Sequence, residues 1–185
     1  MRVPKVSLIF VLAFAPLWGA SDLPPEANRL QPDHSPTPFS AEAIREASPA
    51  GHTIRHVVEV TGQPAIRSVT VFLEGDMETA RFRFYNEDAA GNRLGELQVG
   101  EAKWLDLQRH ASFPAEHTSI ASASVTLAAG SFECWLYTVT GEAAEQTTES
   151  RFWFAQDLPG PPVKMVQSRD GEVVMTMTLE APATE

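Results

Sequence analysis

From residue 52 onward, apolar side chains recur at every second position along most of the chain. A period of two places successive side chains on opposite faces of a β-strand. The alternation covers residues 52–61, 65–73 and 77–85, and it returns over 118–127, 132–140, 151–154, 163–168 and 173–179. Together with a short strand expected near 96–99, these segments predict about nine strands.

Turn-forming residues separate the predicted strands. Asp170-Gly171 is typical of a two-residue β-hairpin turn, and Gly130-Ser131, Gly62-Gln63-Pro64 and Gly91-Asn92 occupy other short connections. A polar loop is expected over residues 141–148. Strands that follow one another through short turns, without a helix between each pair, predict an antiparallel sheet.

Two short segments have a helical pattern instead. Ser40 stands where a helix over residues 41–47 would be capped, and Phe39 and Ile44 have the spacing of a hydrophobic staple across that cap. A second brief helix is expected within residues 102–111, with Trp104 and other apolar side chains on one side. The predicted fold class is therefore mainly β: a curved antiparallel sheet, or half-barrel, with two short helices packed on it.

Two of the predicted strands carry large apolar groups on both faces. Phe132 and Leu136 alternate with Trp135 and Tyr137, and Trp153 stands between two phenylalanines. A sheet with one face in water does not need both sets. Either a helix or loop covers the second face there, or the sheet curves around an apolar groove.

The N-terminus has the composition of a secretory signal peptide. Arg2 and Lys5 precede an uncharged run over residues 6–18, and small residues at 19 and 20 end it. This run is too short to span a bilayer core of about 30 Å, so we expect residues 1–20 to be removed and no stable membrane insertion afterwards. The expected location is periplasmic or extracellular.

Composition divides the remainder of the chain. Five prolines among polar residues over 21–38 predict a flexible linker, residues 39–180 a single β-rich domain, and 181–185 a loose tail. The whole chain has 14 basic and 24 acidic residues and a net charge of −10. Such a surface repels phosphates and anionic headgroups, so nucleic acids and electrostatic membrane docking are not expected as partners.

The candidate chemistry is sparse. Cys134 is the only cysteine, so no internal disulfide is possible, and its aromatic strand pattern predicts a buried thiol. His52 and His56 would lie about 13 Å apart along a strand, too far for one zinc ion, so neither a metal nor another cofactor is expected. No short catalytic motif occurs, although a hydrolase triad assembled across the fold stays open as an alternative.

The C-terminal third resembles a known group of proteins. Residues 130–137, 152–155, 158–163 and 170–172 resemble uncharacterised exported bacterial proteins that are similar to the lipoprotein-carrier superfamily. The resemblance implies a curved antiparallel half-barrel partly closed by helices. It also implies that acyl chains or another apolar partner bind in the concave face, without assigning any single residue to that role.

Five aromatic residues are the candidate lining of such a groove, and each is alternatively a core residue: Trp104, Phe113, Trp135, Trp153 and Phe154. The first functional hypothesis is an exported, non-enzymatic protein that holds an apolar, lipid-like ligand or an acylated partner in a groove of the sheet. The second is a module that binds cell-envelope proteins without a ligand cavity, and the third is the hydrolase with a distributed site.

Overall fold

The computed structural model describes residues 23–143 and 146–181. The predicted signal peptide over 1–20 and most of the predicted tail over 181–185 lie outside the described residues. The described chain is mainly β, with two short α-helices and two single-turn 3₁₀ helices.

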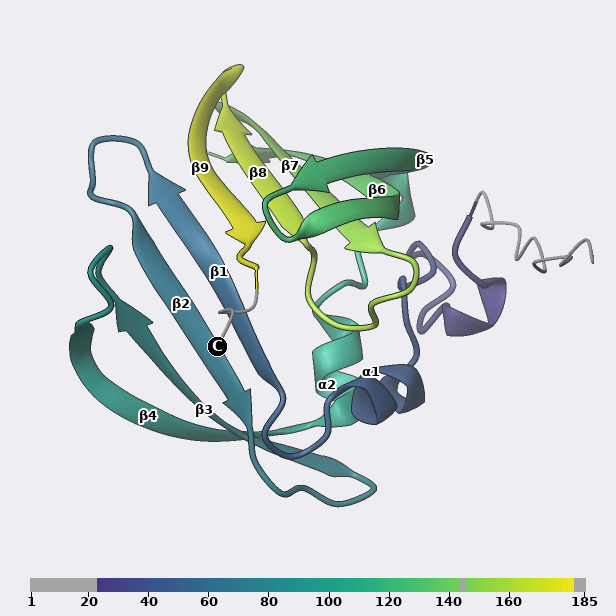
Figure 1. The fold of residues 1–185 in the computed structure, drawn as a ribbon. Helices are drawn as coiled ribbons and strands as arrows, with labels where there is room; N and C mark the ends of the chain where they lie inside the picture. Colours follow the sequence, from purple (N-terminus) through teal and green to yellow (C-terminus); the bar gives the residue numbers. More distant parts are fainter. Residues whose placement is uncertain (1–22, 144–145, 182–185) are drawn as a thin grey trace, which may run out of the picture.

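Nine antiparallel strands form one curved sheet that does not close (Figure 1). Their order across the sheet is β4-β3-β2-β1-β9-β8-β7-β6-β5. The bounds are β1 Thr53–Val60, β2 Ile66–Phe72, β3 Thr79–Glu87, β4 Arg93–Lys103, β5 Thr118–Leu127, β6 Gly130–Ala143, β7 Gln146–Ala155, β8 Lys164–Arg169 and β9 Glu172–Leu179. The predicted fold class is confirmed.

The middle of the sheet pairs the first strand with the last. Val58 stands opposite Met177 and Val60 opposite Met175 in this β1–β9 pairing. On either side of it, every pair of neighbouring strands is also consecutive in sequence. The predicted Asp170-Gly171 turn joins β8 to β9, with both residues at positive φ, 50° and 82°, as a type I′ turn requires.

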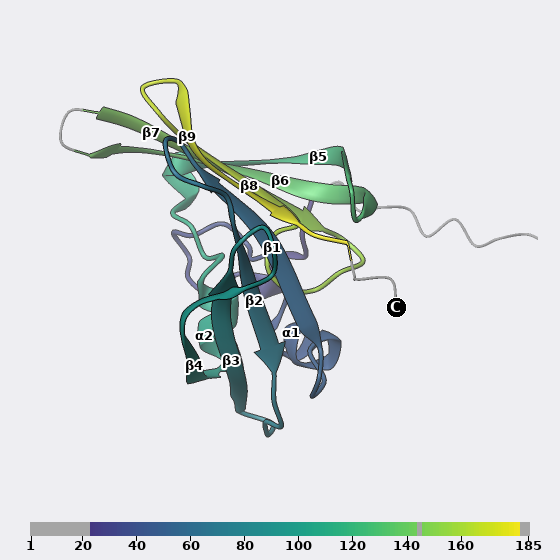
Figure 2. The same ribbon diagram turned by 60° about the vertical axis from the view of Figure 1, so that its left-hand side comes forward.

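The helices lie together on the concave side of the sheet (Figure 2). Helix α1 is Ala41–Ala47 and α2 is Trp104–Arg109, and the 3₁₀ helices are η1 Glu26–Asn28 and η2 Ala115–His117. The Ser40 hydroxyl accepts a hydrogen bond from the Ala43 backbone N–H at 3.2 Å, so the predicted cap of α1 is present. Helix α2 follows edge strand β4, and the chain then passes to the opposite edge strand, β5.

Apolar side chains pack on both faces of the sheet. The concave cluster joins both helices to the strands through buried Phe39, Ile44, Phe72, Trp104, Trp135, Tyr137 and Phe154. A smaller cluster on the other face is built on Cys134, Ala155 and Val163, with Leu158 of the β7–β8 loop packed against it. A loop thus covers the second apolar face, which was one of the two arrangements expected.

The prediction of a flexible linker over residues 21–38 is wrong for its described part. Ser35 and Thr37 are buried, and the buried Tyr137 hydroxyl donates to the Pro36 carbonyl oxygen at 2.7 Å. The Ser35 N–H donates to the Phe113 carbonyl oxygen at 2.9 Å. Proline lacks an N–H but keeps its carbonyl acceptor, so a proline-rich segment is still held by donors from the domain.

The strands around two loops are longer than the pattern predicts. Strand β4 covers 11 residues where four were expected, because Gly95 at φ 73° and an irregularity in the β3–β4 register interrupt the alternation. The predicted polar loop over 141–148 instead continues the hairpin, with Gly141 opposite Thr148 and Glu142 opposite Thr147. Strand segments that extend beyond the core lack the hydrophobic period, and β4 exposes Leu94, Leu97 and Val99.

Candidate ligand-binding site

A cavity lies between the concave face of the sheet and the segments that cover it. Its volume is about 430 Å³, within the range of roughly 300–1,000 Å³ typical of small-molecule sites. We call it the inner cavity. Its lining includes Ile54, Phe72, Phe113, Phe152, Met165 and Met177, together with residues of α1, α2 and the β7–β8 loop.

Three phenylalanine rings form a continuous part of the wall. Phe152 and Phe154 are two positions apart on β7 and therefore share a face, and their ring centroids lie 6.2 Å apart. Phe113, in the segment after α2, stacks on Phe152 with a centroid distance of 5.0 Å. The crossover from β4 to β5 thus places an aromatic ring against the sheet.

Two methionines continue this wall towards the middle of the sheet. Met165 of β8 stands opposite Phe152, and Met177 of β9 stands opposite Met165. Both are half-buried. Methionine side chains are unbranched and flexible, so they adapt to ligands of irregular shape.

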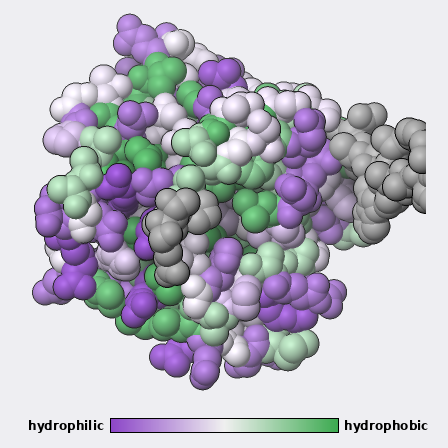
Figure 3. Space-filling view, viewed as in Figure 1, coloured by the Kyte–Doolittle hydropathy of each residue, from purple (hydrophilic) through white to green (hydrophobic). Residues whose placement is uncertain are grey.

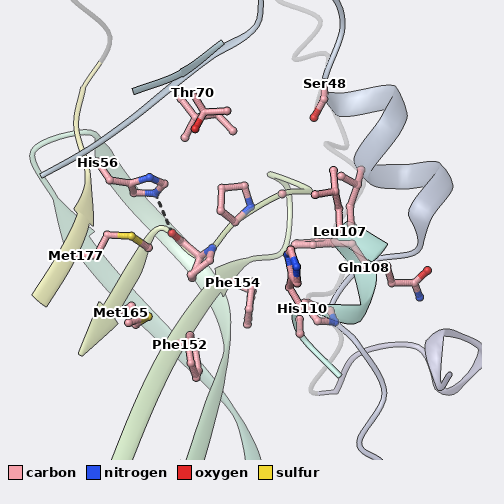
Figure 4. Close-up of a pocket in the computed structure, with 18 of the residues that line it drawn as sticks. Ser48, His56, Thr70, Leu107, Gln108, His110, Phe152, Phe154, Met165 and Met177 are labelled. Carbon is pink, nitrogen blue, oxygen red and sulfur yellow. Dashed lines mark hydrogen bonds between the residues drawn. The ribbon is translucent and has the colours of Figure 1, made fainter. Parts of the chain in front are cut away.

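Few polar groups face the inner cavity. The Gln108 side-chain oxygen accepts a hydrogen bond from the Ala41 N–H, and its amide N–H donates to the Thr37 hydroxyl, both at 2.9 Å. Figure 4 shows this amide pointing away from the other labelled residues. Ser48, Thr70 and two histidines remain. No Lys, Arg, Asp or Glu of the described chain lines the inner cavity.

His56 is the buried histidine of this wall. Its Nε2–H donates to the Pro162 carbonyl oxygen at 3.1 Å, the dashed line in Figure 4. Burial lowers the pKa of the imidazole, and the hydrogen bond to Pro162 opposes this only in part. The neutral form is therefore favoured, as expected for an apolar setting.

The loop that receives this hydrogen bond closes one side of the cavity. We call residues 158–162 the strap. Three of its five residues are prolines, which have no N–H to donate, and Gly160 has a φ of 152°. The face of the molecule in Figure 3 shows hydrophobic (green) patches between hydrophilic (purple) ones.

A second cavity of about 480 Å³ lies on the other side of the strap. Residues 52–55 of the chain line it on one side, the strap and Val163 on another, and residues 179–181 on a third. We call it the outer cavity. Ile54, Gly160 and Pro161 line both cavities, so these three residues stand between them.

The structure separates the five aromatic residues predicted as the lining. Phe113 and Phe154 line the inner cavity. Trp104 is a core residue that stacks on Phe72 at a centroid distance of 6.0 Å, and Trp135 is a core residue that packs against Phe39 at 5.8 Å. Neither tryptophan lines a described cavity.

Trp153 lies on the opposite face of β7 from Phe152 and Phe154. Its ring stands near two cations, with the Lys164 ammonium 5.0 Å and the Arg151 guanidinium 5.7 Å from the ring centroid. Cation–π contacts of this kind stabilise a half-exposed indole. Trp153 thus belongs to the second apolar cluster and has no part in the inner cavity.

Sequence reasoning did not select Ile54, His56, Met165 or Met177 as site residues. The alternation of apolar and polar positions places Ile54 and His56 on one face of a strand and Met177 on one face of another. This pattern does not indicate which face of the sheet becomes concave.

Cys134 has the surroundings of a structural thiol. It is fully buried, and burial, followed by the charges of Glu133 and Asp157, raises its pKa to about 11. Its Sγ lies 3.6 Å from the Phe132 carbonyl oxygen. A nucleophilic cysteine needs a lowered pKa and a neighbouring base, and this geometry provides neither.

Within residues 23–143 and 146–181, no group of three or more His, Cys, Asp or Glu side chains is arranged to hold a metal ion. In the same residues, no helix has the length and apolar character needed to cross a membrane. Comparisons with protein-family models, with curated proteins and with solved structures gave no match to this chain.

Proposed function

We propose that this protein is an exported, non-enzymatic binding protein that holds an apolar, lipid-like molecule in the inner cavity. Export is part of the proposal because residues 1–20 have the composition of a signal peptide. An acylated partner that inserts its chain into the same cavity is included in this class of ligand.

The observation that carries the proposal is the combination of volume and lining. The inner cavity has about 430 Å³, its wall is aromatic and thioether-rich, and its described lining contains no Lys, Arg, Asp or Glu side chain. Apolar surface left in contact with water costs about 25 cal/mol per Å². An apolar ligand that replaces this water would be stabilised, whereas a charged substrate would find no partner there.

The test is binding of N-phenyl-1-naphthylamine, an uncharged apolar fluorophore, to the purified protein. The diagnostic variant is Met177→Trp, because a larger side chain on this face of β9 occupies cavity volume. The matched control is Thr178→Trp, because the next residue along a strand points to the opposite face. Thr178 lines neither cavity.

We expect saturable binding to the unmodified protein and to Thr178→Trp. Binding to Met177→Trp should weaken by about tenfold or more, the equivalent of about 1.4 kcal/mol. Absence of saturable binding to the unmodified protein would contradict the proposal. An equal loss in both variants would also contradict it, because the probe would then not be reporting on the concave face.

One observation favours the second candidate function, a protein-interaction module. Strand β4 exposes Leu97 and Val99, which are two positions apart and therefore share a face, the latter with 61% of its surface accessible. Clustered exposed apolar residues mark interaction surfaces. If this candidate is correct, the double variant Leu97→Lys, Val99→Lys should no longer capture a cell-envelope partner in a pull-down from the host. Its binding of the naphthylamine probe should be unchanged.

A further inference from the structure

We infer that the ligand is an anionic amphiphile with a single alkyl chain, whose chain occupies the inner cavity and whose head lies in the outer cavity against Arg55. This inference rests on the proposed function and adds the polarity and orientation of the ligand. It is carried by the charges of the outer cavity, by the position of the two cavities on either side of the strap, and by the contrast between their linings.

The charge of the outer cavity comes from Arg55. This side chain is half-buried, and among the residues described it has neither an ion pair nor a side-chain hydrogen bond. The acidic residue of the outer cavity is Glu180, and its carboxylate already accepts a hydrogen bond from Arg67 Nε at 2.7 Å. Among residues 23–143 and 146–181, Arg55 is therefore a cation without a counter-ion, in a chain whose net charge is −10.

A half-buried guanidinium is a suitable partner for a carboxylate or phosphate head. Its planar set of donors matches both groups, and charge-assisted hydrogen bonds of this kind are about twice as strong as neutral ones. An ammonium head would be repelled by Arg55, and a hydroxyl head would offer the guanidinium only a neutral acceptor. The outer cavity thus selects for anions, although the surface as a whole repels them.

The two cavities adjoin where the pairing of β1 with β9 ends. Strand β9 pairs with β1 from His56 onward, and the Glu180 N–H still donates to the Arg55 carbonyl oxygen at 2.9 Å, so residues 53 and 54 have β2 on one side and the outer cavity on the other. Ile54 and Gly160 line both cavities at this boundary. Gly160 has no side chain, and open space lies where its Cβ would stand.

The two linings match the two parts of an amphiphile. The inner cavity has no Lys, Arg, Asp or Glu in its described lining, whereas the outer cavity has Arg55 and the Arg67-paired Glu180. A head group anchored at Arg55 directs its chain past Ile54 and Gly160 to the aromatic wall. The strap lies over the chain, held through Pro162 by the hydrogen bond from His56.

The experiment compares three ligands that share a chain and differ in the head: dodecanoate, 1-dodecanol and dodecylamine. Each displaces N-phenyl-1-naphthylamine from the purified protein at about pH 7.5, where the acid is anionic and the amine cationic. The variants are Arg55→Gln, which removes the charge, and Arg55→Lys, which keeps it. Arg83→Gln is the matched control, since Arg83 is exposed on β3, lines neither cavity and alters the net charge equally.

We expect the unmodified protein to bind dodecanoate about tenfold or more tightly than dodecanol, and dodecylamine most weakly. Arg55→Gln should abolish the preference for the acid by weakening the binding of dodecanoate about tenfold, with a much smaller change for dodecanol, whose retained binding shows that the variant is folded. Arg55→Lys should keep part of the preference, and Arg83→Gln all of it.

Two results would overturn the inference while leaving the proposed function standing. One is equal affinity of the unmodified protein for dodecanoate and dodecanol. The other is an equal loss of the acid preference in Arg55→Gln and Arg83→Gln, which would assign it to the net charge. If none of the three ligands displaces the probe, the inference and the proposed function fail together.

Discussion

Replacing Tyr137 by Phe tests how the proline-rich segment before α1 is attached to the domain. The substitution removes one hydroxyl, which donates to the Pro36 carbonyl oxygen at 2.7 Å, and leaves the fully buried ring in place. A hydrogen bond contributes about 0.5–1.5 kcal/mol net, and an acceptor left buried without a donor costs about 1–3 kcal/mol. We therefore expect the free energy of unfolding to fall by about 1–2 kcal/mol.

The chain provides a matched control because it has two tyrosines. Tyr85 lies on β3 with its hydroxyl outside any hydrogen bond of the described residues, so Tyr85→Phe should change the free energy of unfolding by less than about 0.5 kcal/mol. Urea denaturation followed by tryptophan fluorescence measures both variants. If the two variants lose the same stability, the segment is not held by this hydrogen bond and the reasoning is refuted.

Two further predictions concern titratable groups. Burial lowers the pKa of His56, so the imidazole of the unfolded chain is protonated before that of the folded chain as the pH falls below about 6.5. In urea titrations above and below this pH, acidification should therefore lower the free energy of unfolding of the unmodified protein more than that of His56→Gln. Equal pH dependence of the two proteins would count against this. Because the pKa of Cys134 is raised to about 11, its reaction with Ellman's reagent near pH 8 should be on the order of 100-fold slower in the folded protein than in urea. A fast reaction of the folded protein would contradict this, because it would show an accessible thiolate.

The strands could be predicted where each has one buried and one wetter face. The segment over 118–127 shows this, since its predicted bounds match β5, Thr118–Leu127. The prediction failed where burial does not follow the strand: β4 is largely exposed along its length, and β7 begins with exposed Gln146 and Thr147. Hydrogen bonding to a neighbouring strand keeps these residues extended, and that pairing leaves no trace in local hydrophobicity.

The N-terminal segment failed for a different reason. Its composition resembles that of disordered linkers, yet Thr37 has no exposed surface and its hydroxyl donates to the Asn28 carbonyl oxygen at 3.0 Å. Other contacts of the segment come from the crossover after α2, where the Phe113 carbonyl oxygen accepts from the Ser35 N–H at 2.9 Å, and these partners are distant in sequence. Composition indicates how much apolar surface a segment can bury, but it contains no information on hydrogen bonds that distant residues make to that segment.

The site could be predicted only as a set of aromatic candidates. Phe113 and Phe154 were chosen as large apolar residues and do line the inner cavity, whereas Trp104 and Trp135, chosen on the same grounds, fill the core. The difference between them is whether the ring borders the inner cavity, because Phe154 is as buried as either tryptophan. Curvature arises from the pairing of all nine strands, so no local pattern distinguishes a wall residue from a core residue.

The pairing of β1 with β9 also fixes the order in which this architecture is completed. Each half of the sheet is a meander of neighbouring hairpins that needs only nearby sequence, but the seam between the halves joins residues 56–60 to residues 175–179. During synthesis from the N-terminus, that seam forms last. A chain shortened by its final strand therefore loses the centre of the sheet and keeps its margins, leaving two half-sheets with unsatisfied inner edges that are prone to associate with other chains.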